Sequence, residues 1–133
     1  MAGETSLTTL LRSMSPQLNP GEFVFCTLPD GSLPVGVEIV GSFREQEGLT
    51  VILERAHAER AGLSFDYVAS WITLNVHSAL EAVGLTAAFA TALGNAQISC
   101  NVVAGYYHDH LFVGQADAER ALQVLRDLAA NAE

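Results

Sequence analysis

The sequence predicts an α+β fold made of two related halves, in which antiparallel sheets carry helices on one face. Short segments in which apolar and polar residues alternate predict strands with one buried face. Longer segments with apolar residues at helical spacing predict helices, and the pattern of residues 51–61 recurs at residues 111–121. Such a repeat predicts an N-terminal half over residues 1–66 and a C-terminal half over residues 67–133.

The composition is that of a globular protein with an acidic surface. Of the 133 residues, 50% are hydrophobic and 16% are charged, which suffices for a sizeable core. The formal net charge of -9 would repel a phosphate backbone, so we expect no nucleic-acid partner. No apolar run reaches the roughly 18–20 residues that cross a bilayer, and the first residues lack the basic and apolar regions of a signal peptide. We therefore expect a cytoplasmic protein with no membrane partner.

The N-terminal half has the pattern of a helix, three strands and a second helix. Leucines at helical spacing predict a first helix that ends before Pro16. An Asn-Pro-Gly turn at residues 19–21 precedes a buried apolar strand. A polar loop between two further strands predicts a hairpin, and Gly62 ends the second helix where a left-handed residue is favoured. The predicted elements are a helix over residues 7–14, strands over 23–28, 37–43 and 49–53, and a helix over 55–61.

The C-terminal half repeats this plan with one additional helix. Ile72, Leu74 and Val76 alternate with polar residues, which predicts a strand with one buried face. The residues from Leu85 to Ala96 form an apolar helical stripe that the N-terminal half lacks. The predicted elements are a strand over residues 71–77, a helix over 85–96, strands over 98–104 and 111–113, and a helix over 118–128.

A shift of 60 positions aligns the end of one half with the end of the other. The residues that are identical to those 60 positions later are Ala56, Ala58, Glu59, Arg60 and Ala61. Because Ala-Glu-Arg-Ala is common in surface helices, a chance match is the alternative. Each copy follows a hairpin of similar size, and this favours a true repeat.

The polar side of the C-terminal sheet carries large aromatic residues. The outward positions of its two central strands are Trp71, Thr73, Asn75, His77, His110 and Phe112. A face with Trp and Phe is rarely left fully in water. We expect the other half of the chain or a second subunit to cover it.

The segment before the long helix of the C-terminal half allows two interpretations. Ser78 and Glu81 have the spacing of a capping box, in which a hydroxyl and a carboxylate satisfy free amides at a helix start. Alternatively, the helix starts nearer Gly84, where the missing Cβ lets a ligand carboxylate approach the backbone. The exposed amides would then favour an anion, and Glu81 could hold an ammonium or guanidinium group.

His108-Asp109-His110 is a candidate metal constellation at the hairpin. Two histidines at alternate positions share one strand face, and imidazole suits zinc, copper or nickel. A further ligand would have to come from His77 or Glu81, so a hydrogen-bonded turn or a polar wall of a ligand pocket is the favoured interpretation. We therefore predict no bound metal.

The order strand, glycine-containing loop, helix, strand, hairpin, strand, helix resembles that of ACT domains. Residues 83–98 resemble the ACT pattern of a glycine that opens the first helix before an alanine- and leucine-rich run. Residues 76–86 with residues 104–112 look like a largely uncharacterised family of small, stand-alone bacterial proteins built from two ACT-like halves, and residues 13–16 and 43–45 share this likeness. The resemblance implies a ferredoxin-like ACT fold.

ACT domains generally bind amino acids or similar small metabolites, so the resemblance implies a non-catalytic sensor or regulatory module. By position, the ligand loop would be residues 77–85. The chain has Ala82-Val83-Gly84 where many regulatory ACT domains have an acidic or amide residue ahead of a Pro-Gly pair. No catalytic domain is attached, which implies a separate regulated protein. The implied partners are an amino-acid-like metabolite, that protein and a second copy of the chain in a homodimer, with no cofactor.

We accordingly predict a ligand site without catalytic residues. Its predicted members are His77, Ser78, Leu80, Glu81, Val83, Gly84, Leu85, Asn101, Tyr106, His108 and His110. Asn101 is alternatively a solvated residue, and Tyr106 a packing residue with its hydroxyl at the surface. Two other functions are alternatives: a ligand-free interaction or dimerisation module, and a metal-dependent enzyme that uses His77, His108 and His110.

Overall fold

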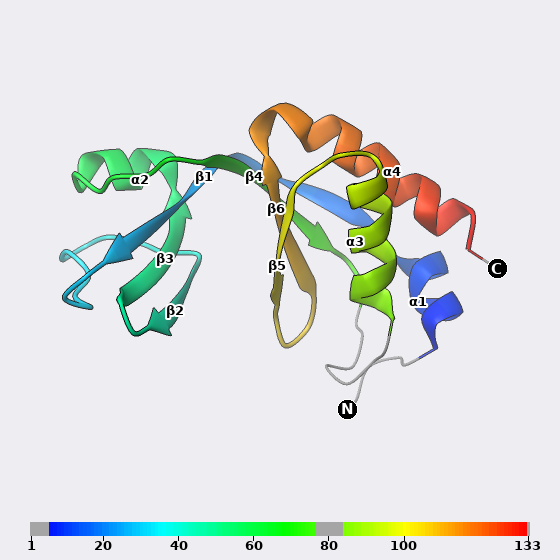
Figure 1. The fold of residues 1–133 in the computed structure, drawn as a ribbon, viewed down its shortest axis with the longest axis horizontal. Helices are drawn as coiled ribbons and strands as arrows, with labels where there is room; N and C mark the ends of the chain where they lie inside the picture. The colour runs from blue at the N-terminus through cyan, green and yellow to red at the C-terminus, as the bar shows by residue number, and fades with distance from the viewer. Residues whose placement is uncertain (1–5, 77–83, 133) are drawn as a thin grey trace. The chain divides into compact units, whose positions relative to one another are not determined.

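The computed structural model describes residues 6–76 and 84–132, and the chain divides into two compact units. Unit 1 contains Met1–Asn19 and Trp71–Glu133, and unit 2 contains Pro20–Ser70. The elements in chain order are α1 (Leu7–Ser13), β1 (Pro16–Leu28), β2 (Gly41–Glu45), β3 (Gly48–Glu54), α2 (Arg55–Arg60), β4 (Val68–Leu74), α3 (Leu85–Asn95), β5 (Cys100–Ala104), β6 (Asp109–Gly114), the short 3-10 helix η1 (Gln115–Asp117) and α4 (Ala118–Ala130) (Figure 1).

Strands β1 and β4 each contribute residues to both units. β1 begins in unit 1 and continues in unit 2, whereas β4 begins in unit 2 and continues in unit 1. The strand order is therefore β1-β4-β6-β5 in unit 1 and β2-β3-β1-β4 in unit 2. The hairpins β2-β3 and β5-β6 and the pair β1-β3 are antiparallel. This ferredoxin-like strand order with added helices confirms the predicted α+β class.

The compact units do not coincide with a simple division of the sequence. The segment up to Asn19 belongs to unit 1, although it comes from the N-terminal end of the chain. Helix α1 packs against α3 and α4. The backbone N–H of Asn75 donates to the carbonyl of Ser15, at 2.8 Å. The start of the chain thus completes the unit that the end of the chain builds.

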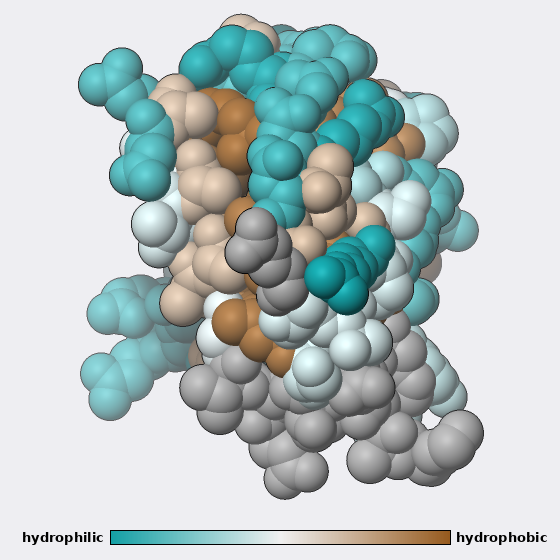
Figure 2. All heavy atoms as spheres, turned by 90° about the vertical axis from the view of Figure 1, so that its right-hand side faces the viewer, coloured by the Kyte–Doolittle hydropathy of each residue, from teal (hydrophilic) through white to brown (hydrophobic). Residues whose placement is uncertain are grey.

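Alternation along β4 and β6 buries one face of the sheet of unit 1 beneath its helices. Ile72 and Leu74 of β4, and Leu111 and Val113 of β6, are fully buried. They form one apolar cluster with helical residues, which include Leu10, Leu85, Phe89, Leu93, Ala121, Leu122 and Leu125. Each such side chain contributes roughly 1.5–3 kcal/mol when it leaves water. At the end of unit 1 shown in Figure 2, hydrophilic residues fill the upper part of the surface, and hydrophobic atoms appear in separate areas between them.

The two halves keep the same register under the 60-residue shift. In the β2-β3 hairpin Ser42 pairs with Val51, and in the β5-β6 hairpin Val102 pairs with Leu111. β3 ends at Glu54 and β6 ends 60 positions later, with a helix following in each case. Burial also repeats after 60 positions: Val51 and its counterpart Leu111 are both fully buried. The pairing pattern therefore confirms the repeat.

Two local predictions in the N-terminal half are wrong. The turn predicted at residues 19–21 lies within β1, where Gly21 adopts a φ of 108° and the strand continues on both sides. The strand predicted from Val37 starts only at Gly41, because Val37 ends a turn in which its N–H donates to the carbonyl of Pro34 at 3.4 Å. At residues 19–21 the strand overrode the local turn signal, and at Val37 a local turn overrode the strand signal. Among the described residues, no helix has the length and apolar character of a membrane span.

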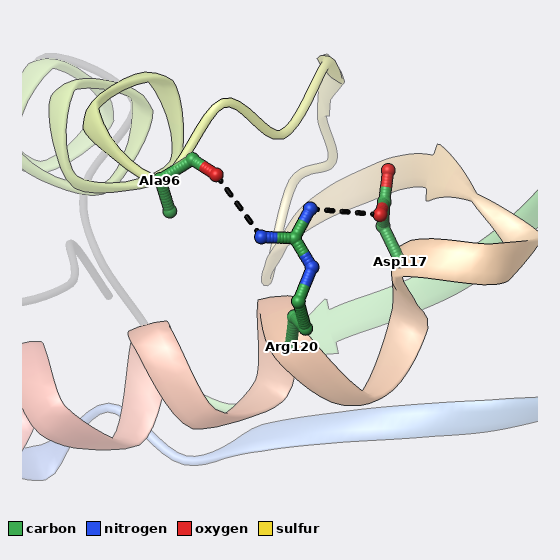
Figure 3. Close-up of polar contacts among 3 residues, drawn as sticks. All are labelled: Ala96, Asp117 and Arg120. Carbon is green, nitrogen blue, oxygen red and sulfur yellow. Dashed lines mark hydrogen bonds and ion pairs between the residues drawn. The ribbon is translucent and has the colours of Figure 1, made fainter.

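Arg120 connects the end of α3 to the start of α4 in unit 1 (Figure 3). Its guanidinium donates to the carbonyl of Ala96 at 3.1 Å and to the carboxylate of Asp117 at 2.9 Å. The carbonyls at a helix C-terminus lack partners within the helix, and an arginine satisfies them well. Arg120 therefore fixes the turn that follows α3.

We expect Arg120→Met to lower the free energy of unfolding by about 0.5 to 1 kcal/mol, the range of an exposed ion pair with one added hydrogen bond. Urea denaturation followed by circular dichroism measures this change. Arg126→Met is the control, because the Arg126 side chain, also on α4, has no polar partner among the described residues. Equal losses in the two variants would contradict a specific role for Arg120.

Candidate functional site

The predicted site residues fall into three groups. Five of them lie outside the described residues: His77, Ser78, Leu80, Glu81 and Val83. Gly84 and Leu85 lie at the start of α3. The remaining four belong to the β5-β6 hairpin: Asn101, Tyr106, His108 and His110. All described members are part of unit 1.

The start of α3 has the properties of an anion site. Gly84 is the N-cap residue, with a left-handed φ of 97°, and the helix begins at Leu85. No described side chain caps this end, and its first turn holds no acidic residue. The free N–H groups and the helix dipole therefore leave a partial positive charge that favours a carboxylate. A helix that begins at Leu85 favours the interpretation in which the helix starts nearer Gly84 and its amides are open to a ligand.

The surroundings of Gly84 are set by the first residue of α1. A Cβ added at Gly84 would lie 3.1 Å from Cδ2 of Leu7, whose side chain is 37% exposed. The left-handed φ favours glycine at position 84, and an added Cβ would need the Leu7 side chain to shift slightly. Leu85 is only 3% exposed and belongs to the core, so it can offer a ligand no more than its backbone amide.

A hydrogen-bonded aromatic network occupies the sheet face of unit 1 opposite to the core. Nε1 of Trp71 donates to Nδ1 of His110 at 3.0 Å, and the hydroxyl of Thr73 lies 3.1 Å from the same nitrogen. The amide of Asn19 donates to that hydroxyl at 2.9 Å. The ring of Trp71 stacks on Phe112, with 6.1 Å between centroids. The outward face that alternation predicts is therefore confirmed for these residues.

The network fixes the protonation state of His110. An indole N–H can only donate, so Nδ1 of His110 accepts and the ring is neutral with its proton on Nε2. Burial lowers the pKa of His110 below its ordinary value, and His108 lowers it further, whereas Asp109 raises it. Protonation of Nδ1 would remove the acceptor of Trp71.

The tip of the β5-β6 hairpin brings the remaining candidates near the end of β4. Nδ1 of His108 lies 3.4 Å from the carbonyl oxygen of Val76. Gly105 donates its N–H to the carbonyl of His108, and a Cβ on Gly105 would lie 2.8 Å from that oxygen. Tyr106 and its neighbour Tyr107 are exposed and contact each other edge to face. The structure thus supports a hydrogen-bonded turn at this end.

The described part of the chain contains no group of three or more His, Cys, Asp or Glu that could hold a metal. His77, the third ligand in the metal alternative, lies outside it. The pKa of Asp109 is raised by burial, and His110 and His108 oppose that rise. Asn101 is exposed on β5, opposite Phe112.

Sequence reasoning did not find Leu7 or Asn19. Leu7 contacts a glycine 77 positions away, and Asn19 binds Thr73, 54 positions away. Local patterns carry no signal for contacts at such separations. The only local signal at Asn19 is the Pro-Gly pair that follows it, and this combination is typical of a turn.

Two family models match the sequence. Both are described as ACT domain, and they match residues 2–70 and residues 67–127. Together they cover nearly the whole chain in two successive copies. No curated protein matches it.

Solved structures with the same fold include proteins of unknown function and regulatory proteins. A protein of unknown function from Vibrio cholerae, described as a possible transport protein, is 53% identical with a TM-score of 0.84, over 96% of this chain and 99% of that one. A protein from Agrobacterium tumefaciens is 17% identical with a TM-score of 0.68, over 87% and 89% of the two chains. The ligand-free regulatory subunit of aspartate kinase from Thermus thermophilus is 9% identical with a TM-score of 0.62, over 88% and 98%. The last two likenesses concern the fold alone.

We expect the fluorescence of Trp71, the single tryptophan, to change as the pH falls from about 7.5 to about 5. Because folding lowers the pKa of His110, the unfolded chain takes up the proton first. The contribution of His110 to stability is complete above pH 6.5, its ordinary pKa, and is lost as the pH falls through the lowered pKa. Emission spectra and urea denaturation at each pH measure both effects.

His110→Gln is the test variant, because an amide oxygen can accept from Trp71 but does not titrate. We expect it to remove the change in emission over this range. His57→Gln, in unit 2, should keep the change. Persistence of the full change in His110→Gln would show that another group controls Trp71.

Proposed function

The chain belongs to the ACT domain family, and we propose that it is a regulatory module that senses a small amino-acid-like metabolite and has no catalytic activity of its own. ACT domains are typically regulatory modules that bind small molecules. Residues 1–66 and 67–133 would be its two ACT-like halves, as the repeat and the two successive family matches suggest. We place the ligand in the C-terminal half.

The observation that best supports this proposal is the structure of the start of α3. Its first turn, which no described side chain caps and which has glycine at the N-cap, suits the carboxylate of an amino acid. Glu81, just before it in the sequence, would hold the ammonium group. The other members of the proposed site are His77, Ser78, Leu80, Val83, Leu85, Asn101, Tyr106, His108 and His110.

We further propose that the protein acts in the cytoplasm as a homodimer and passes its ligand state to a separate protein. The exposed edge of the unit 1 sheet favours the homodimer. β5 is an edge strand without charged residues, and Val102 and Val103 are 36% and 42% exposed. Unprotected edge strands readily pair with another chain. The same edge supports the second candidate function, a ligand-free dimerisation or docking module.

We expect at least one proteinogenic amino acid to raise the melting temperature. Ligand at 100 times its Kd adds about 2.7 kcal/mol to the stability of a protein that binds only when folded. Thermal-shift measurements with each amino acid, followed by calorimetry, provide the check. A response to none of them, with a dimer that forms without any ligand, would favour the docking module instead.

Gly84→Ala should abolish that response, because strain at the left-handed N-cap would shift the first-turn amides. The variant alone also costs about 1 kcal/mol or more of stability, since the backbone is left-handed and the new Cβ meets Leu7. The double variant Gly84→Ala with Leu7→Ala separates the two effects. It should recover part of the stability but no binding at α3, measured by the amide signals of Leu85 and Thr86, whereas restored binding there would remove the α3 start from the site.

A further inference from the structure

Arg60 and Arg120 occupy equivalent positions of the repeat but differ in their partners. The two arginines are 60 positions apart, each within an Ala-Glu-Arg-Ala segment. Arg120 binds the carbonyl of Ala96 and the carboxylate of Asp117 (Figure 3). The side chain of Arg60 has no hydrogen bond or ion pair with any described residue. A guanidinium offers five donors, so it has the capacity to bind an added acceptor.

Among the described residues, Arg60 binds neither of the two kinds of acceptor that Arg120 uses in unit 1. The position of Asp117 is taken by His57, which removes the carboxylate. The carbonyl of Ala96 belongs to the end of α3, and unit 2 has no helix between β1 and β2. Residues 29–40 form an irregular segment there instead, with turns at residues 29–30 and 35–36.

The turn that ends α3 nevertheless has a counterpart in unit 2. In unit 1, Gln97 donates its N–H to the carbonyl of Gly94 at 2.9 Å. Sixty positions earlier, Val37 donates its N–H to the carbonyl of Pro34 at 3.4 Å. The helix is missing, but the turn on which the arginine would dock is preserved.

A cavity of about 590 Å³ lies between this turn and α2. It is lined by residues 34–38 of the turn and by His57, Arg60 and Ala61. All of them belong to unit 2. Like Arg60, the side chain of Glu38 has no polar partner among the described residues. The cavity is thus lined by an exposed cation and an exposed anion, neither of which has a polar partner within the part of the chain that the structure describes.

We propose that this cavity is a second binding site, which takes a small amino carboxylate. The carboxylate of this ligand binds Arg60 and takes the place of the two acceptors that Arg120 has in unit 1. A guanidinium binds a carboxylate through two parallel hydrogen bonds. The ammonium group of the ligand binds the carboxylate of Glu38, which would repel a simple anion. Val37, which is half-buried, supplies an apolar contact for the carbon skeleton, whereas Val35 is exposed. This site goes beyond the proposed function, since it lies in unit 2 and does not depend on the start of α3.

The test uses the full chain and two matched probes, acetate and glycine, which differ by the ammonium group. The Nε–H signals of the arginines are followed by ¹⁵N NMR while sodium chloride keeps the ionic strength constant. We expect the Arg60 signal to move with both probes and glycine to bind about threefold more tightly, as one exposed ion pair allows. The signals of Arg120 and Arg126 should stay in place. Equal movement of Arg126, or no preference for glycine, would overturn the proposal.

Three variants define the roles of the residues. Arg60→Met, followed through the backbone amide signals of residues 35–38, should weaken glycine binding by about tenfold, the loss of one bidentate contact. His57→Asp restores the pattern of the C-terminal half, so the new carboxylate should pair with Arg60 and also block binding. Arg126→Met is the matched control and should bind as the unaltered chain does. Unchanged binding in either Arg60→Met or His57→Asp would overturn the assignment.

The two sites can be distinguished by testing the variants of each site for binding at the other. Gly84→Ala with Leu7→Ala should leave the response of the Arg60 signal to glycine intact. Arg60→Met should leave the amino-acid response at α3 intact. Loss of the Arg60 response in the double variant would mean that one site was being observed twice, and the second site would be rejected.

Discussion

The period-two alternation of β4 and β6 is the constraint on which the rest of unit 1 depends. It sends Ile72 and Leu111 into the core beneath the helices, where they are fully buried. The intervening positions must then project from the other face, which is why Trp71 and His110 meet there. A shift of one residue in register would exchange the two sets and expose the core. The chemical properties of the outer face are therefore a direct consequence of how the core is packed.

The same constraint links the protonation of His110 to the fold. Its Nδ1 accepts from a donor that cannot reverse its role, so the neutral ring is the form that the face can accommodate. Thr73 and Asn19 extend the hydrogen bonds toward β1. Polar groups that are satisfied in this way add rigidity to a face that would otherwise carry only stacked aromatic rings.

The repeat explains both the likeness of the units and their difference. The hairpins and the helices that follow them agree in register, so the units share a plan. The difference lies in α3, which only unit 1 has among the described residues. Without that helix, the turn at residues 34–37 and the helix α2 border a cavity. One sequence motif, Ala-Glu-Arg-Ala, thus has a structural role in unit 1, whereas in unit 2 its arginine has no polar partner in the described part of the chain.

The sequence by itself determined the class of the fold, the long helix of the C-terminal half, the repeat and the face on which Trp71 and His110 lie. These follow from periodicity, which a chain carries locally. Only the tertiary structure decided that the segment up to Asn19 completes unit 1, that Leu7 lies against Gly84 and that β1 continues through the predicted turn. Such contacts join residues more than 50 positions apart, as between Asn19 and Thr73. Their free energy comes from surfaces that exist only after the strands and helices have packed.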